Sequence, residues 1–282
     1  MIERRDVAAN AFADVVDGFG DEWSRFDQSA LDDEELQEMF DDYFSIFPWS
    51  KVSKTAIGVD FGCGSGRWAR LVAPRVGTLH CVDASAEALA VAAKNLSGQP
   101  NCRLHHASVA QLPLPDAFAD FGYSLGVLHH VPDTQAAIQS CAAKLKSGAP
   151  FLLYLYYRFD NRAAWFRLLW RLSESLRFIV SRLPKPLRYA VSQLLAILFY
   201  WPLSRAAGFL ERRGLNVDSF PLSSYRNRSL YVLRNDALDR FGTRVERRFT
   251  RAEIETMMRT AGFRDIVFSD HQPYWCAVGV KQ

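Results

Sequence analysis

Three alternate glycines follow an apolar run and an acidic residue, and this arrangement could cradle a cofactor. The run at 57–59 leads through Asp60 to Gly62, Gly64 and Gly66, and then into a predicted helix. A parallel strand that ends in such a loop presents backbone N–H groups to a nucleotide-like ligand. The glycines alone leave the ligand open, because residues 64–69 also satisfy the dinucleotide fingerprint GxGxxG/A.

Two acids narrow the choice of ligand. Asp83 ends the next apolar run, at 79–82, and the carboxyl ends of neighbouring parallel strands face one crevice. Asp83 is therefore placed to accept hydrogen bonds from a ribose diol. Asp60 precedes the first glycine, where a negative charge suits the cationic end of a ligand and would repel a pyrophosphate.

Four motifs occur in a characteristic order along the chain. They are the DxGxGxG loop at 60–66, the acid Asp83, the segment LPLPDAFAD at 112–120 and the phrase GVLHHVPD at 126–133. In these motifs the sequence resembles the class I S-adenosylmethionine-dependent methyltransferases of the small-molecule type. The resemblance covers about residues 55–157, with a weaker continuation from about 250 to 282, and it implies S-adenosylmethionine as the cofactor and methyl transfer as the activity.

The resemblance also implies a set of cofactor contacts. This chain departs from the family's pattern at one of these contacts. The family commonly presents an acid to the adenine amino group where this chain has Ser108, so that the adenine contact could rest on the backbone of Val109. The residues expected at the cofactor are Asp60, Gly62, Cys63, Gly64, Gly66, Asp83, Ala84, Ser108, Val109 and Leu125.

The N-terminal region carries a second local resemblance. Residues 19–26 are similar to an FGxEWxxF segment that precedes the catalytic domain in some bacterial biosynthetic methyltransferases. The resemblance implies that this segment folds over the cofactor, with Trp23 at the cofactor and Phe26 towards the substrate. Aromatic faces attract a sulfonium cation by about 0.5–2 kcal/mol, depending on desolvation. Packing of both aromatics in an ordinary core is the alternative.

Candidate proton acceptors and substrate contacts follow the next two predicted strands. His129 and His130 follow a predicted strand at 121–125, and Tyr156, Tyr157 and Arg158 follow one at 151–157. His130 is the preferred general base, His129 is the second candidate, and the alternative is that both histidines only shape their loop. Phe26, Tyr156, Tyr157 and Arg158 are the predicted substrate residues. No metal site is expected.

Alternating strands and helices predict an α/β fold with a Rossmann-like, doubly wound sheet of seven strands, an antiparallel final strand and a mainly helical insertion after strand 5. Ser85 is the predicted N-cap of a helix at 86–96, and Thr250 and Glu253 form a predicted capping box. The expected domains are a helical arm or lid at 1–50, the cofactor-binding core at 51–157, a basic and aromatic insertion that caps the substrate at 158–249, and a closing helix and strand hairpin at 250–282.

The predicted insertion combines positive charge with apolar segments. Residues 158–250 hold 18 bases and 7 acids, residues 158–180 are patterned as a basic amphipathic helix, and residues 194–201 form an apolar run. Three interpretations stay open: a cap packed on the core, a peripheral membrane contact through 158–203, and RNA binding. Nucleic acid is the least favoured partner, because the insertion is more apolar than a nucleic-acid groove.

Composition agrees with one globular enzyme of 282 residues and 49% hydrophobic content. We expect a cytoplasmic location, with or without contact at a membrane surface, because the N-terminus lacks an apolar leader, no apolar run reaches about 18 residues, and the five cysteines are scattered. The leading hypothesis is methyl transfer to a small, apolar or lipid-linked acceptor. The alternatives are an RNA methyltransferase, a nicotinamide-dependent dehydrogenase and a membrane-surface binding protein with a non-catalytic cofactor fold.

Overall fold

The computed structural model describes residues 3–4 and 12–282, so residues 1–2 and 5–11 of the predicted N-terminal arm lie outside it. Its described residues form two compact units. The first contains the described residues up to Gln28 together with Leu36–Arg158 and Val245–Gln282, and the second contains Ser29–Glu35 and Phe159–Arg244.

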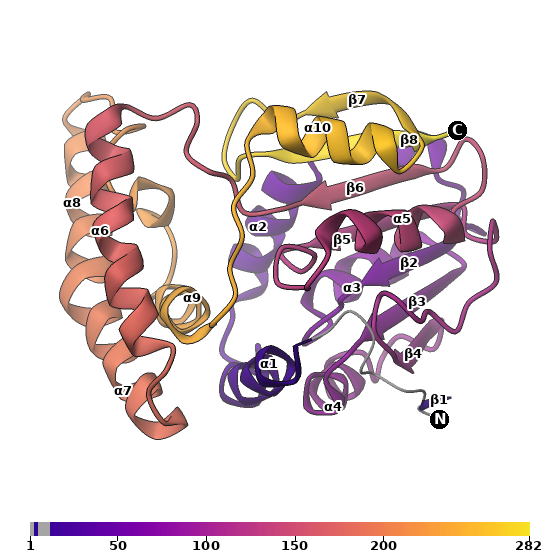
Figure 1. The fold of residues 1–282 in the computed structure, drawn as a ribbon, viewed down its shortest axis with the longest axis horizontal. Coiled ribbons are helices and arrows are strands. Elements are labelled where there is room, and N and C mark those ends of the chain that lie inside the picture. Colours follow the sequence, from indigo (N-terminus) through magenta and orange to yellow (C-terminus); the bar gives the residue numbers. More distant parts are fainter. Residues whose placement is uncertain (1–2, 5–11) are drawn as a thin grey trace. The chain divides into compact units, whose positions relative to one another are not determined.

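The first unit is built on a mixed sheet with the strand order β1-β4-β3-β2-β5-β6-β8-β7 (Figure 1). The last strand, β8, is antiparallel to both β6 and β7, and the other neighbours are parallel. The strands are β1 (Glu3–Arg4), β2 (Ile57–Phe61), β3 (Thr78–Asp83), β4 (Cys102–His106), β5 (Phe121–Leu125), β6 (Pro150–Tyr154), β7 (Phe263–Phe268) and β8 (Cys276–Lys281).

The direction of winding reverses between β2 and β5. From β2 the chain proceeds outward through β3 to β4, and then returns to place β5 and β6 on the other side of β2. Crossovers between parallel strands are right-handed, so the helices on the two sides of this point cover opposite faces of the sheet. Ligands bind in such folds in the crevice beyond the carboxyl ends of the strands at this switch point, which here is where β2 and β5 end.

Helices of the first unit connect and cover these strands. They are α1 (Ala13–Arg25), α2 (Asp33–Phe44, which begins in the second unit), α3 (Arg67–Val72), α4 (Ala86–Asn95), α5 (Thr134–Lys144) and α10 (Arg251–Thr260), with short turns η1 (Trp49–Lys51) and η2 (Ala73–Arg75). Helices α5 and α10 share one apolar core with the sheet, in which Ile138, Met258 and Phe151 are completely or almost completely buried.

Local signals in the sequence set several of these boundaries. Ser85 caps α4, since its Oγ accepts a hydrogen bond from the Ala88 N–H at 3.2 Å. Thr250 and Glu253 form the predicted capping box of α10. Each such cap satisfies backbone N–H groups that the first turn of a helix leaves unpaired, and contributes about 1 kcal/mol.

The second unit consists of helices, shown in salmon and orange in Figure 1. Half of its buried apolar residues lie on α9, to which both α6 and α7 pack. The helices are α6 (Ala164–Val180), α7 (Lys185–Leu195), the π-helical turn η3 (Ala196–Tyr200), α8 (Trp201–Arg212), η4 (Ser223–Tyr225) and α9 (Leu230–Gly242). None of the helices in the described residues is both long and apolar enough to cross a membrane.

The predicted fold class is confirmed, and the structure adds detail that the sequence pattern lacked. A further strand, β1, pairs with β4 at Glu3 and Arg4. Strand β6 ends at Tyr154, not at 157 as predicted, because the chain turns there to form a bridge between Tyr157 and Phe249. The boundaries of the two units also differ from the predicted insertion at 158–249. Arg158 and residues 245–249 belong to the first unit, where the Arg158 N–H donates to the Phe249 carbonyl at 2.9 Å.

Candidate active site

The glycine loop is fixed to β3 by its own backbone. The N–H groups of Gly62 and Cys63 both donate to the Val82 carbonyl, at 2.8 and 2.9 Å. Gly62, Gly64 and Gly66 all have positive φ, at +85°, +52° and +75°, which side-chain-bearing residues rarely adopt. A Cβ atom on Gly62 would lie 2.4 Å from the side chain of Val127. The loop that carries the two predicted histidines therefore lies directly against the glycine loop.

Asp83 lies at the end of β3, as predicted, and its carboxylate closes the glycine loop. Oδ2 accepts the Gly64 N–H at 2.8 Å, and Oδ1 accepts the Ser85 N–H at 2.8 Å. Burial raises the pKa of Asp83, although the N–H groups of Ser85 and Gly64 act to lower it. Each carboxylate oxygen can accept a further hydrogen bond, so the side chain can hold the loop and a ligand hydroxyl together.

Asp60 is 1% exposed in the middle of the sheet, where β2 pairs it with Cys81 and Tyr123. Burial raises the pKa of its carboxyl well above the usual value, and the nearby Tyr123 hydroxyl opposes that rise. These two side chains do not form a hydrogen bond of normal geometry with each other. Both Asp60 Oδ2 and the Tyr123 hydroxyl lack a partner among the described residues. A buried polar atom without a partner is costly, and a cationic or hydrogen-bonding ligand group would relieve that cost.

The N-terminal helix α1 lies on the glycine loop. A Cβ on Gly64 would lie 3.0 Å from Cε2 and Nε1 of the Trp23 indole. Asn95, the last residue of α4, donates from Nδ2 to the carbonyls of Asp27 and Ser65, at 2.9 Å each. This side chain ties the segment after α1 to the loop. Phe26 is 2% exposed, so its predicted contact with substrate stays a prediction, alongside the alternative of ordinary core packing.

The turn after β4 holds Ser108 in a local role. Its Oγ accepts the Ala110 N–H at 3.2 Å, and its carbonyl accepts the Gln111 N–H at 3.1 Å. Both Ser108 and Val109 are buried. The Ser108 hydroxyl therefore stabilises its own turn, and the expected contact of the cofactor with the backbone of Val109 stays a prediction. Nearby, the ring of His106 bonds the Ala84 carbonyl at 2.9 Å and joins the ends of β3 and β4.

Leu125 ends β5, and the two histidines follow in the loop beyond it. His130 contacts the Val245 carbonyl through Nδ1 at 2.6 Å. A carbonyl oxygen only accepts, so Nδ1 carries the proton, and the Nε2 of the neutral ring is left as a proton acceptor. That Nε2 is buried and has no partner in the described part of the chain. The ring of Phe19, on α1, covers His130 with 4.9 Å between ring centroids.

His129 is completely buried, and burial holds its pKa well below the usual value, with His130 and Arg248 adding to the effect. Neither of its ring nitrogens has a hydrogen-bond partner among the described residues. Its ring lies 3.9 Å from that of Tyr156, between centroids. His129 is therefore a neutral ring, and the structure brings the predicted residues His129, His130 and Tyr156 into one cluster.

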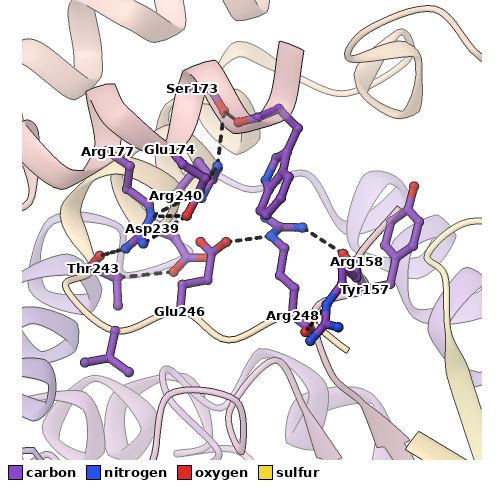
Figure 2. Close-up of polar contacts among 12 residues, drawn as sticks. Tyr157, Arg158, Ser173, Glu174, Arg177, Asp239, Arg240, Thr243, Glu246 and Arg248 are labelled. Atoms are coloured by element: carbon purple, nitrogen blue, oxygen red, sulfur yellow. Dashed lines mark hydrogen bonds and ion pairs between the residues drawn. The ribbon is translucent and has the colours of Figure 1, made fainter. Parts of the chain in front are cut away.

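The segment after β6 is held by residues that the sequence analysis missed. Arg248 lies over the Tyr156 ring, 5.2 Å from its centroid, donates to Glu246 at 2.7 Å and donates to the Tyr157 carbonyl at 3.2 Å (Figure 2). Both charged residues belong to the stretch just before α10 and carry no motif. Only the high density of bases at 244–251 could have drawn attention to Arg248.

The remaining predicted substrate residues are engaged elsewhere. Arg158 forms an ion pair with Glu253 at 3.1 Å and donates from Nε to the Arg248 carbonyl at 3.1 Å. Tyr157 packs against Tyr274, at 5.6 Å between centroids. A second missed residue, Tyr43 of α2, lies between Trp68 and Tyr154, at 5.0 and 5.1 Å. These contacts place aromatic side chains of α2 and α3 beside the end of β6.

Comparison with known proteins gives the class of this site. Residues 59–153 match the family described as "Methyltransferase domain". An uncharacterized methyltransferase of Bacillus subtilis, YcgJ, is 32% identical over 101 residues, which is 35% of this chain and 40% of that protein. Phosphoethanolamine N-methyltransferase 2 of Caenorhabditis elegans is 30% identical over 101 residues, or 35% of this chain and 23% of that protein. The chain thus spans less than half the length of these relatives.

A solved structure from Bordetella parapertussis, described as a possible exported protein, shares the fold. It covers 93% of this chain and 79% of its own, with a TM-score of 0.53 and 14% sequence identity. The fold and the glycine loop define a cofactor-binding domain of the Rossmann-like class. Residues 59–153 of this domain are similar to methyltransferase domains, and the cofactor that this similarity indicates is S-adenosylmethionine. The dinucleotide interpretation of the glycine loop is thereby set aside.

Several features of the site fit S-adenosylmethionine. Asp60 Oδ2 and Ser65 Oγ are buried polar atoms without partners among the described residues. The Asp83 carboxylate can accept hydrogen bonds beyond those from Gly64 and Ser85, and Trp23 packs on the Cβ-free face of Gly64. The residues present therefore suit a ligand with a ribose diol at one end and positive charge at the other.

Proposed function

We propose that the protein transfers the methyl group of S-adenosylmethionine to a small acceptor that is apolar or lipid-linked. The observation that carries the proposal is the direct contact between the glycine loop and the histidine loop, through Gly62 and Val127. This contact supports a role for His130 Nε2 as the proton acceptor next to the loop that would hold the donor. Phe19 and Tyr156 lie against the two histidines, which favours an acceptor with apolar or aromatic character.

The bound cofactor would supply a methyl group activated by positively charged sulfur, for in-line transfer to the acceptor with S-adenosylhomocysteine as the leaving group. Asp83 would hold the ribose, and the unpartnered Asp60 Oδ2 and Ser65 Oγ would orient the donor. Trp23 would cover the loop and keep water out of the site, which strengthens the electrostatic interactions inside it. Alignment of the two reactants is the largest contribution that a protein makes to such a displacement.

His130 would receive the proton that the acceptor loses. Its Nδ1 bond to Val245 fixes the ring orientation and leaves Nε2 basic. General-base catalysis of this kind contributes about 10²–10⁴ in rate. His129, Tyr156 and Arg248 form the adjoining wall, where the acceptor would bind. In this proposal Phe26, Tyr157 and Arg158 support that wall and do not react.

The activity can be tested with S-adenosylmethionine carrying a labelled methyl group, the purified protein and a lipid extract. Label should appear in an organic-soluble product with the wild-type protein and be lost with His130→Asn, in which the side-chain amide can still donate to Val245. Label that appears only in added RNA would favour the RNA methyltransferase alternative. Failure to label either material, with cofactor binding intact, would leave a binding protein with a non-catalytic cofactor fold and refute the proposal.

A further inference from the structure

The helical unit has polar residues on its inner face and apolar residues on its outer face. Helix α6 and the continuous helix formed by α7, η3 and α8 both lie against α9. Helices on the surface of a protein in water normally show the opposite arrangement, with the apolar stripe facing the core. Both helical segments have this inverted pattern.

Ion pairs and hydrogen bonds hold the inner face of α6. Glu174 pairs with Arg177 at 3.1 Å and also with Arg240 of α9, and Arg177 donates to the Thr243 carbonyl at 2.9 Å (Figure 2). The outer face holds large apolar side chains instead. Leu172 is 64% exposed and Leu168 is 59% exposed.

The helix formed by α7, η3 and α8 repeats the pattern. On its inner face Arg188 donates to the Gly242 carbonyl at 3.1 Å, and Gln193 accepts from Arg234 Nε at 2.6 Å. The exposed apolar residues Leu187, Leu194, Leu198, Trp201 and Phe209 recur three, four, seven or eight positions apart, so that they share one face. This outer stripe requires an apolar environment beyond the described chain.

The charges around these faces indicate what that environment is. Between residues 161 and 210 the chain holds eight arginines or lysines and one acid, Glu174, which is already paired. Arg167 and Arg171 lie exposed among the leucines of α6, and in the described part of the chain neither guanidinium has an ion-pair partner. A second copy docked through the same face would bring these like charges together, which disfavours self-association.

Aromatic and arginine side chains are also paired along the outer faces. Arg182 lies over Phe178 and Arg213 over Phe209, with 3.5 and 4.6 Å from guanidinium carbon to ring centroid. Each arginine follows its aromatic partner by four positions. This arrangement suits the boundary of a bilayer, where aromatic rings lie at the level of the headgroups and arginines extend to the phosphates.

We propose that the outer faces of α6 and of the helix α7-η3-α8 dock on the surface of a bilayer rich in anionic lipids, with the leucines entering the acyl boundary. This proposal rests on the proposed function in one respect only: the membrane would supply the lipid-linked acceptor. Docking itself depends on apolar area and on attraction between arginines and anionic headgroups, each basic residue adding to the affinity.

Co-sedimentation of the full-length protein with vesicles tests the surface. The wild type should bind vesicles of phosphatidylcholine mixed with phosphatidylglycerol, bind phosphatidylcholine alone far more weakly, and lose binding as salt is raised. The double variant Leu168→Glu/Leu172→Glu should not bind. The variant Arg167→Gln/Arg171→Gln should bind anionic vesicles about tenfold or more weakly, since two basic residues near the surface are removed.

The matched control is Val267→Glu, which also introduces an acid at an exposed apolar position, 55% exposed on β7 of the other unit; it should bind vesicles like the wild type. Retained binding of S-adenosylhomocysteine by every variant would show that each is folded and that methyl-donor binding is a separate property. Absence of wild-type binding to anionic vesicles would overturn the inference. So would a wild-type dimer that Leu168→Glu/Leu172→Glu converts to a monomer without any lipid binding, because a second copy would then be the occupant.

Discussion

The Trp23 indole packs on the Cα of Gly64, so that a methyl group at this glycine would lie 3.0 Å from the ring. Trp23 belongs to α1 and Gly64 to the loop between β2 and α3, 41 positions later in the chain. This contact places the N-terminal helix on the glycine loop. A substitution at either residue should therefore change the affinity for the cofactor.

Gly64→Ala should weaken binding of S-adenosylhomocysteine strongly and lower stability by about 1–2 kcal/mol, because φ of +52° is unfavourable for alanine and its methyl group crowds Trp23. Titration calorimetry and thermal unfolding measure the two effects. Gly148→Ala is the matched control. Gly148 also has positive φ, at +84°, but nothing lies within 4 Å of a Cβ there, so stability should fall and affinity should not. Equal affinity losses in both variants would contradict the role of the Trp23 contact.

Asn95→Ala should release the segment after α1 from the glycine loop. The carbonyls of Asp27 and Ser65 lose their shared donor, at a cost of about 1–3 kcal/mol, and protease cleavage near residues 26–32 should accelerate. Bound S-adenosylhomocysteine should slow that cleavage in the wild type more than in the variant. Asn101→Ala offers a close comparison, because Asn101 Nδ2 also joins two carbonyls, those of Ala73 and Val76. It should lose stability without faster cleavage at that segment.

Prediction from sequence succeeded where the cause of structure is local. Ser85 and the pair Thr250 and Glu253 cap their helices through residues two to four positions away, and such signals can be seen in the chain itself. The end of β3 at Asp83 followed from the apolar run before it. The fold class then followed from the order of strands and helices, which the sheet confirms.

The parts that escaped prediction depend on contacts between distant residues. Asp83 was expected to face a ribose, but its bond to the Gly64 N–H could not be foreseen, because it depends on how the loop curls back over β3. Arg248 joins Tyr157 across 91 positions, without any sequence motif. Residues 158–180, which contain most of α6, were predicted as an amphipathic helix, yet the pattern alone does not say which face is buried.

His80 should make the protein less stable in mild acid. Burial, together with the charges of His105 and Arg103, lowers the pKa of His80 from 6.5 to about 4. The unfolded chain therefore binds more protons between these two values, so that this contribution to stability is complete above pH 6.5 and is lost as pH falls towards about 4. Unfolding in urea across this range measures it. His80→Gln should flatten the dependence, whereas an unchanged slope would show that other groups cause it.

His130→Asn should lower the rate of methyl transfer by about 10²–10⁴ without loss of S-adenosylhomocysteine affinity. With both substrates saturating, the loss should appear in kcat. The control is His271→Asn, since His271 is exposed in a loop and its ring Nδ1 bonds the carbonyl of the neighbouring Gln272. A rate of methyl transfer that is unchanged in His130→Asn would assign the base to another group.

The central claim is that the loop from Asp60 to Gly66 and the carboxylate of Asp83 hold S-adenosylmethionine. Calorimetric titration of the purified full-length protein with S-adenosylhomocysteine tests this most directly. We predict saturable binding at one site in the wild type, loss of binding in Asp83→Ala and unchanged binding in Asp270→Ala, where the carboxylate is exposed beyond β7. No binding to the folded wild-type protein, or equal binding by Asp83→Ala, would contradict the account.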